Sequence, residues 1–127
     1  MAEAHISGKK LTQALREMKE ISRMDFVLFS KKGKLLASTC PEPDMKMQEF
    51  VTQFGKSMAE SQTIQDWIFL KIEINEKTEH ILLVNKNGSE DSSYVIGRMA
   101  ACQIRNLYLS AQEPVNETNF LRRMLHG

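Results

Sequence analysis

The amino-acid sequence predicts an α+β fold in which an antiparallel sheet is covered by helices. Residues 66–85 contain two apolar runs rich in β-branched residues, separated by a short polar turn, which is the pattern of an antiparallel hairpin. The segments on either side of this hairpin carry apolar residues at helical spacing. Helices packed on an antiparallel sheet form a layered α+β architecture.

The first strand of this hairpin predicts how much cover the sheet needs. Side chains alternate between two faces along a strand. One face is apolar throughout and consists of Ile68, Leu70, Ile72 and Ile74. The opposite face begins with Trp67 and Phe69 and continues with Lys71 and Glu73. We therefore expect full helical cover on one side of the sheet and partial cover on the other.

The chain before this hairpin predicts a helix, a hairpin and a second helix. Residues 9–24 carry the helical stripe Leu11, Ala14, Leu15, Met18 and Ile21. Ser7 or Gly8 is the expected helix cap, after a disordered leader over residues 1–8. Residues 25–39 read as a hairpin that turns at Gly33. The second helix, which contains Gly55 as a place for close approach to the sheet, is expected to end near residue 61. Its stripe is Met47, Phe50, Val51, Phe54 and Met58.

The third helix, expected over residues 93–112, is too apolar for a single stripe. One line consists of Val95, Met99 and Cys102, and its neighbour of Ile96, Ala100, Ile104, Leu107 and Ala111. A helix that is apolar over most of its circumference is buried by more than one neighbour. One neighbour is the sheet, and the other is the first helix or a second copy of the chain.

We expect a homodimer that uses this helix, because soluble monomers avoid large exposed apolar patches. The predicted interface residues are Ile96, Ala100, Ile104 and Leu107. Aspartate in place of Ile96 or Ile104 is expected to disrupt folding or assembly.

Composition restricts the functional classes. The chain has 127 residues, and 17 basic against 16 acidic residues give a net charge of +1. This balance of charges argues against nucleic-acid binding through bulk charge. Residues 9–113 are expected to form a single domain. No apolar run approaches the ~20 residues that span a bilayer. Cys40 and Cys102 fit no zinc spacing. We expect two reduced thiols in a cytoplasmic protein without a membrane segment.

No pattern of catalytic residues stands out, so we expect no enzyme, no metal and no cofactor. The histidines are His5, His80 and His126, of which two lie near the termini, and His80 is expected to be structural. The candidate ligand-binding residues are Trp67, Phe69, Lys71, Phe50 and Phe54, since they combine apolar walls with a polar group. The alternative is that these aromatic residues simply pack beneath the second helix.

The last third of the chain carries a resemblance. Residues 94–104, Tyr-Val-Ile-Gly-Arg-Met-Ala-Ala-Cys-Gln-Ile, are followed after Pro114 by residues 119–125, Asn-Phe-Leu-Arg-Arg-Met-Leu. This pattern resembles the end of the N-terminal sensor domain of PucR/CdaR-like bacterial helix-turn-helix transcriptional regulators. The resemblance implies a ligand-sensing, dimerising regulatory domain with a small-molecule effector. Residues 114–127 would then begin a linker helix to a missing downstream region, which alone would contact DNA.

The layout is also similar to that of small PAS, GAF and roadblock (profilin-like) modules, which is an analogy at the level of the fold. It leaves a second hypothesis open. The chain would then be a roadblock/longin-like protein-interaction module that scaffolds a small GTPase or a complex.

Overall fold

A computed structural model describes residues 6–40, 45–76, 78–86 and 88–112 of the chain. Five strands form one sheet in the order β2-β1-β5-β4-β3, and every neighbouring pair is antiparallel. The elements in chain order are α1 (Gly8–Ser22), β1 (Phe26–Ser30), β2 (Leu35–Ser38), α2 (Met45–Lys56), β3 (Ser61–Ile64), β4 (Trp67–Glu73), β5 (Glu79–Asn85) and α3 (Glu90–Gln112).

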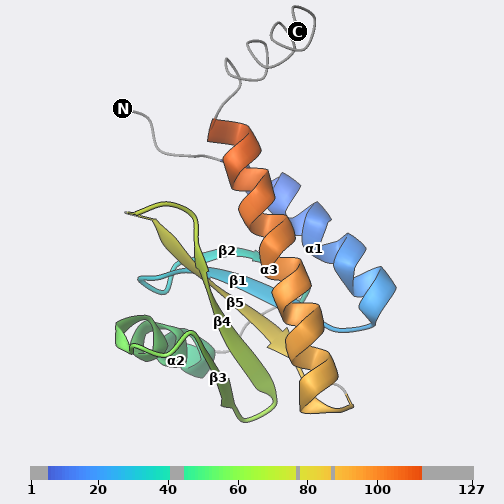
Figure 1. Cartoon of the computed structure of the whole chain (residues 1–127), viewed down its shortest axis with the longest axis vertical. Helices are drawn as coiled ribbons and strands as arrows, with labels where there is room; N and C mark the ends of the chain where they lie inside the picture. Colours follow the sequence, from blue (N-terminus) through green and yellow to red (C-terminus); the bar gives the residue numbers. More distant parts are fainter. Residues whose placement is uncertain (1–5, 41–44, 77, 87, 113–127) are drawn as a thin grey trace, which may run out of the picture.

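The elements form three layers. Helices α1 and α3 lie side by side and run in opposite directions on one face of the sheet, and α2 covers the other face (Figure 1). Strand β5 is central and pairs with β1 and β4, so the hairpin of residues 66–85 lies in the middle of the sheet. The predicted α+β fold class is confirmed.

The larger core lies between the sheet and the α1–α3 layer. Helix α1 contributes Leu11 and Leu15, and α3 contributes Ala100, Ile104 and Tyr108. The sheet contributes residues of one face, which include Phe26, Leu28, Ile68, Leu70, Ile72, Leu82 and Val84. The wholly apolar face that the sequence assigned to the first central strand is therefore the face covered by two helices.

The smaller core lies between the sheet and α2. Val51 and Phe54 of α2 meet Val27, Phe69 and Leu83 of the sheet, and Phe50 and Trp67 pack at the edge of this cluster. Because the second face of β4 turns polar at Lys71 and Glu73, a single short helix is enough to cover its apolar part. The prediction of unequal cover is confirmed.

The expected end of the second helix was wrong. Helix α2 ends at Lys56, and the following residues lead into strand β3, which the sequence analysis did not predict. Met58 matches the helical spacing of the stripe, but its side chain is 98% exposed. Strand β3 escapes prediction because its sequence, Ser-Gln-Thr-Ile, is short and largely polar.

Two glycines bring helices unusually close to the sheet. A Cβ atom at Gly97 of α3 would lie 2.6 Å from Leu70 Cδ1 and 2.9 Å from Val84 Cγ1. A Cβ atom at Gly55 of α2 would lie 2.9 Å from the carbonyl oxygen of Lys31. The expected close approach at Gly55 is confirmed, and Gly97 lies on the side of α3 that faces the sheet.

The helix boundaries differ slightly from the expected ones. Ser7 caps α1, since its Oγ accepts a hydrogen bond from the Lys10 amide at 3.2 Å. Within the expected leader of residues 1–8, Ile6 belongs to the core and Gly8 begins α1. Residues 1–5 and the predicted linker helix over residues 114–127 lie outside the described residues.

Candidate interaction surface

The inward side of α3 contains the residues that the sequence assigned to a dimer interface. Ala100 is 0% exposed and Ile104 is 1% exposed, and both pack against the sheet of the same chain. Ile96 and Leu107 are partly buried against the same core. The predicted interface was therefore wrong for Ala100 and Ile104, because these two side chains have no surface to offer to a second copy.

The opposite side of α3 is exposed and partly apolar. Val95 is 55% exposed and Met99 is 59% exposed. Cys102 and Asn106 are also exposed, and Leu109 is partly buried. We call this set the α3 outer face: Val95, Met99, Cys102, Asn106 and Leu109. The sequence analysis placed the first three on one line but missed that Asn106 and Leu109 continue it at the same spacing.

The α3 outer face has few polar interactions of its own. Asn106 Nδ2 lies 3.9 Å from Cys102 Sγ, a weak contact with a poor acceptor. On the flank, Arg105 Nε donates a hydrogen bond to the carbonyl oxygen of Glu73 at 3.0 Å, which fixes α3 to the end of β4. Arg98 is exposed on the same flank. The face is thus partly apolar, with arginine residues along one flank.

The predicted ligand-binding residues lie together, between α2 and the sheet. Phe54 and Phe69 are buried and meet edge to face, with ring centroids 5.8 Å apart. The ammonium of Lys71 lies 5.0 Å from the Phe54 ring centroid and donates to the carbonyl oxygen of Ser57. These contacts hold the end of α2 on β4. The aromatic residues therefore pack beneath the second helix, which is the alternative that the sequence analysis left open. Their role in binding a ligand stays a prediction.

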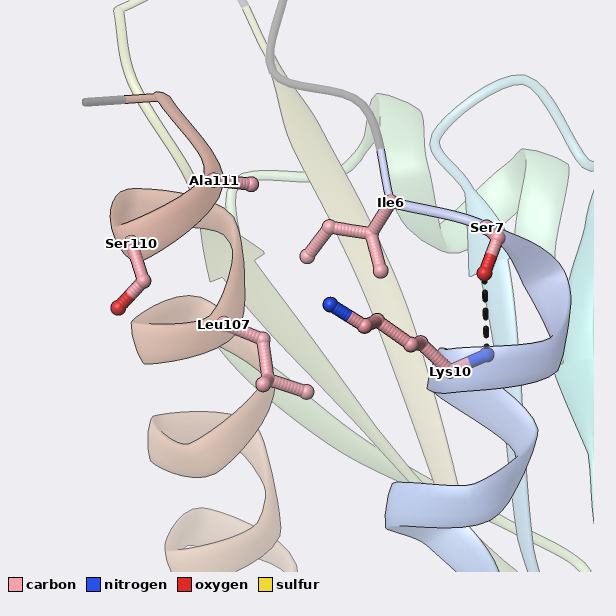
Figure 2. A pocket seen from close by; sticks show the side chains of 6 residues that line it. All are labelled: Ile6, Ser7, Lys10, Leu107, Ser110 and Ala111. Carbon is pink, nitrogen blue, oxygen red and sulfur yellow. Dashed lines mark hydrogen bonds between the residues drawn. The ribbon is translucent and has the colours of Figure 1, made fainter. Parts of the chain in front are cut away.

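A cleft of about 380 Å³ lies between the start of α1 and the end of α3 (Figure 2). Its walls are formed by Ile6, Ser7, Lys10, Leu107, Ser110 and Ala111. The Lys10 side chain reaches from α1 across the cleft toward α3 (Figure 2). The sequence analysis missed this cleft because Ile6 was assigned to the leader, although an apolar residue directly before a helix cap often packs against that helix.

The border of α1 with the sheet is polar. Lys19 Nζ lies 2.7 Å from Asp25 Oδ1, which also accepts a hydrogen bond from Thr39 Oγ1 at 2.8 Å. Hydrogen bonding from Lys19 lowers the pKa of Asp25. Arg16, Lys19, Glu20, Arg23 and Thr39 surround an open depression here. Three of these residues are basic and one is acidic, and Lys19 is already paired with Asp25.

His80 is buried under the last turns of α3. Its ring meets that of Tyr108 edge to face, with centroids 5.0 Å apart, and its Nδ1 lies 3.1 Å from the Glu79 carbonyl oxygen. Burial lowers the pKa of His80 below the ordinary value of 6.5.

The described residues contain no group of three or more histidine, cysteine, aspartate or glutamate side chains that could hold a metal ion. Cys40 and Cys102 are both free thiols.

Comparison with known proteins identifies the fold. Three solved structures match with high probability: MglB with a tetrameric arrangement (14% identity, TM-score 0.58), the gliding protein MglB from Thermus thermophilus (13%, 0.57) and MglB from Myxococcus xanthus (11%, 0.57). Each match covers 96% of the known chain, and they cover 86%, 85% and 87% of this chain, respectively. The likeness shows the fold, which is the roadblock type among the layouts that the sequence suggested.

The comparisons overturn the resemblance to PucR/CdaR-like regulators. No family model and no curated protein matches the chain. The structural matches are MglB proteins rather than the sensor domain of a transcriptional regulator. The expected roles in ligand sensing and transcription regulation were therefore wrong. Among the described helices, none combines the length and the apolar character needed to cross a membrane.

Proposed function

We propose that this chain is a roadblock/longin-like protein-interaction module, which scaffolds a small GTPase or a larger complex. The α3 outer face carries this proposal. Val95 and Met99 are each more than half exposed, at 55% and 59%, on a helix whose opposite side packs in the core. Aligned exposed apolar side chains on a stable helix are typical of a surface that a protein partner covers.

The fold supports the same proposal. A three-layer domain with a rigid sheet and a helix presented on its outside can hold a partner without moving its own core. One structural neighbour is described as MglB in a tetrameric arrangement. A domain of the same fold therefore assembles with further copies, which supports self-assembly of this chain as well.

We also propose that the module is not an enzyme. The one histidine in the described residues, His80, is 8% exposed and packs against Tyr108, so its ring has little access to a substrate. Lys71, a candidate from the sequence, is engaged with Phe54 and with the end of α2. Histidine and lysine often act in catalysis, but here His80 and Lys71 contact the helices that pack on the sheet.

A binding experiment with purified small GTPases tests the proposal. The chain is immobilised on a surface. Each small GTPase of the organism that produces the chain is then applied, loaded either with GDP or with a non-hydrolysable GTP analogue. We expect at least one GTPase to bind, with an affinity that depends on the nucleotide. Met99→Glu is expected to weaken binding, whether the GTPase meets the α3 outer face or an assembly that this face holds together.

Gln53→Glu is the matched control, because it adds the same charge to an exposed position on α2, the layer opposite α3. This variant is expected to bind as the unchanged chain does. If no GTPase binds in either nucleotide state, the assignment of the partner class is wrong.

A further inference from the structure

We propose that one edge of the molecule, formed by α1 and β2, binds the surface of an anionic lipid membrane. We call it the basic edge: Lys9 and Arg16 of α1, Arg23 at the C-cap of α1, and Lys34 beside β2. Three observations support the proposal: the alignment of these cations, their lack of acidic partners among the described residues, and the charges on the opposite edge. The proposal goes beyond the partner proposed above and does not depend on it.

The cations of α1 lie in line along one flank of the helix. Lys9, Arg16 and Arg23 are seven residues apart, which is close to two helical turns, so their side chains leave α1 on the same side. All three residues are exposed. From Lys9 to Arg23 the row is about 21 Å long, at about 1.5 Å per residue.

This flank of α1 lies beside β2, which is an edge strand of the sheet. At the start of α1, an added Cβ atom at Gly8 would lie 3.5 Å from the carbonyl oxygen of Leu36. At the end of α1, Arg16 and Arg23 line an open depression together with Thr39, which directly follows β2. The row of cations therefore follows the edge of the sheet.

Lys34 adds a fourth cation to the row. It directly precedes β2 and lies two residues before Leu36. Alternate residues of a strand point to the same face of the sheet, and Leu36 packs against the core that α1 covers. Lys34 is therefore on the face of α1, near the start of that helix. Leu35, which is 45% exposed, adds an apolar side chain to this edge.

The basic edge has no acidic partner within the described part of the chain. No ion pair joins any of its four cations to another described residue. Lys19, which lies between the two arginines in the sequence, is paired with Asp25 instead. Glu20 borders the same depression as the two arginines but forms no ion pair with them. Cations that the fold leaves unpaired are available to an external anion.

The opposite edge of the sheet has the opposite charge. Glu60 and Asp66 lie on either side of β3 in the chain, and Glu73 and Glu76 lie at the end of β4 and after it. All four are exposed. Because the whole chain has a net charge of only +1, an anionic surface does not attract the molecule evenly. It attracts the basic edge and repels the β3 edge, which favours one orientation.

A lipid surface fits the basic edge better than a nucleic acid or an acidic peptide does. Successive cations of α1 are about 10 Å apart, whereas the phosphates of a DNA strand follow about every 3.4 Å. No aromatic residue belongs to the basic edge, so bases have nothing to stack on. A peptide that added to the edge of β2 would meet α1 at Gly8. Lipid headgroups move laterally and can gather at cations of any spacing, and Leu35 can enter the headgroup layer.

Binding to vesicles tests the proposal. The full chain is mixed with vesicles of equal parts phosphatidylglycerol and phosphatidylcholine, and with vesicles of phosphatidylcholine alone. Sedimentation then measures the bound fraction. We expect binding to the anionic vesicles only. Raising the salt concentration from about 0.1 M to about 0.5 M should release the chain, because salt screens the attraction.

The test variant is Arg16→Gln with Arg23→Gln, which removes two charges and keeps good helix-forming residues. Each basic residue near an anionic membrane contributes about fivefold to binding, so this variant should bind about thirtyfold more weakly. The matched control is Arg98→Gln with Arg105→Gln, which removes the same charge at the same spacing from α3, near the end of β4. The control should bind nearly as the unchanged chain does. Circular dichroism first shows that both variants are folded.

An environment-sensitive dye reads the orientation of the bound chain. In one protein the dye is attached at position 35, through Leu35→Cys in a chain that also carries Cys40→Ser and Cys102→Ser. In the other it is attached to Cys102 of the α3 outer face, in a chain that carries Cys40→Ser. The dye at position 35 should brighten when anionic vesicles are added, and the dye on Cys102 should not.

Several results overturn the proposal. They are no binding to anionic vesicles at about 0.1 M salt, equal weakening by the two double variants, and brightening on Cys102 rather than at position 35. Soluble poly-glutamate provides a further comparison. If the chain binds poly-glutamate through Arg16 and Arg23 but ignores the vesicles, the occupant is an acidic protein and the proposal is wrong. None of these results bears on the GTPase experiment, so the two proposals fail separately.

Discussion

At the scale of single residues, His80 shows how a polar side chain is used inside this fold. The sequence placed it at a strand start with a structural role, and the structure finds its ring buried against Tyr108. Trp67, Phe69 and Phe54 also pack between α2 and the sheet, and their role in binding a ligand stays a prediction. Residue type alone does not separate these uses, because both need aromatic surface beside a polar group.

His80 gives the protein a dependence on pH. The pKa of His80 in the folded chain is lower than 6.5, so below that pH the unfolded chain binds a proton that the folded chain does not. Its contribution to stability is therefore fully present above pH 6.5 and is lost as the pH falls below it. We expect the melting temperature to fall between about pH 7 and pH 5.

The control for this prediction is His80→Leu, which keeps an apolar contact with Tyr108 and removes the titrating ring. The melting temperature of this variant should depend less on pH over the same interval. Equal slopes for both proteins would show that other groups cause the effect. Asp25 does not contribute to this dependence on pH, because its pKa is lowered from the ordinary value of 3.8 and lies outside the interval that is measured.

At the scale of elements, the sequence analysis found the helices and strands that bury many apolar residues and missed the strand that buries few. The helices α1 and α3 and the central hairpin were found because their apolar residues keep a clear period. Strand β3 was missed because it lies at the edge of the sheet, where a strand needs little apolar sequence. The inward side of α3 was misread because its two apolar lines look alike in the sequence, and only Gly97 distinguishes the side in contact with β4 and β5.

Gly97 is the residue that sets the position of α3, and Gly97→Ala tests this. The added Cβ would lie 2.6 Å from Leu70 Cδ1 and 2.9 Å from Val84 Cγ1, so the helix must shift or the core must repack. We expect the free energy of unfolding to fall by about 1–3 kcal/mol, as measured by urea denaturation.

The matched control is Gly8→Ala in the first turn of α1, where the nearest atom to an added Cβ is the Leu36 carbonyl oxygen at 3.5 Å. That variant should be neutral or slightly more stable, because alanine favours a helix more than glycine does. Equal effects of the two substitutions would mean that the close approach at Gly97 does not limit the packing of α3.

At the scale of the whole molecule, the fold class was within reach of the sequence, whereas the resemblance to a family of regulators was wrong. Alternating strands and periodic helices restrict the architecture, but many proteins with different functions share it. The resemblance to PucR/CdaR-like regulators depended largely on α3 and on residues after Pro114, where a long apolar helix followed by a break is a common arrangement. The sequence analysis predicted neither strand β3 nor the order of the strands, whereas the structural comparison matches the fold over 86% of the chain.

The central claim is that α3 has two sides with different tasks: an inner side that holds the fold together and an outer side that meets partners. Ile104 and Met99 represent the two sides, at 1% and 59% exposure. The most direct test is to measure thermal unfolding at low protein concentration, and self-association at high concentration, for Ile104→Asp and Met99→Glu side by side.

The account predicts that Ile104→Asp abolishes cooperative unfolding, because an unpaired carboxylate in the core costs several kcal/mol. Met99→Glu should unfold within about 0.5 kcal/mol of the unchanged chain and lose its self-association. A folded Ile104→Asp variant that fails only in assembly, or a Met99→Glu variant that cannot fold, would contradict the assignment of the two sides.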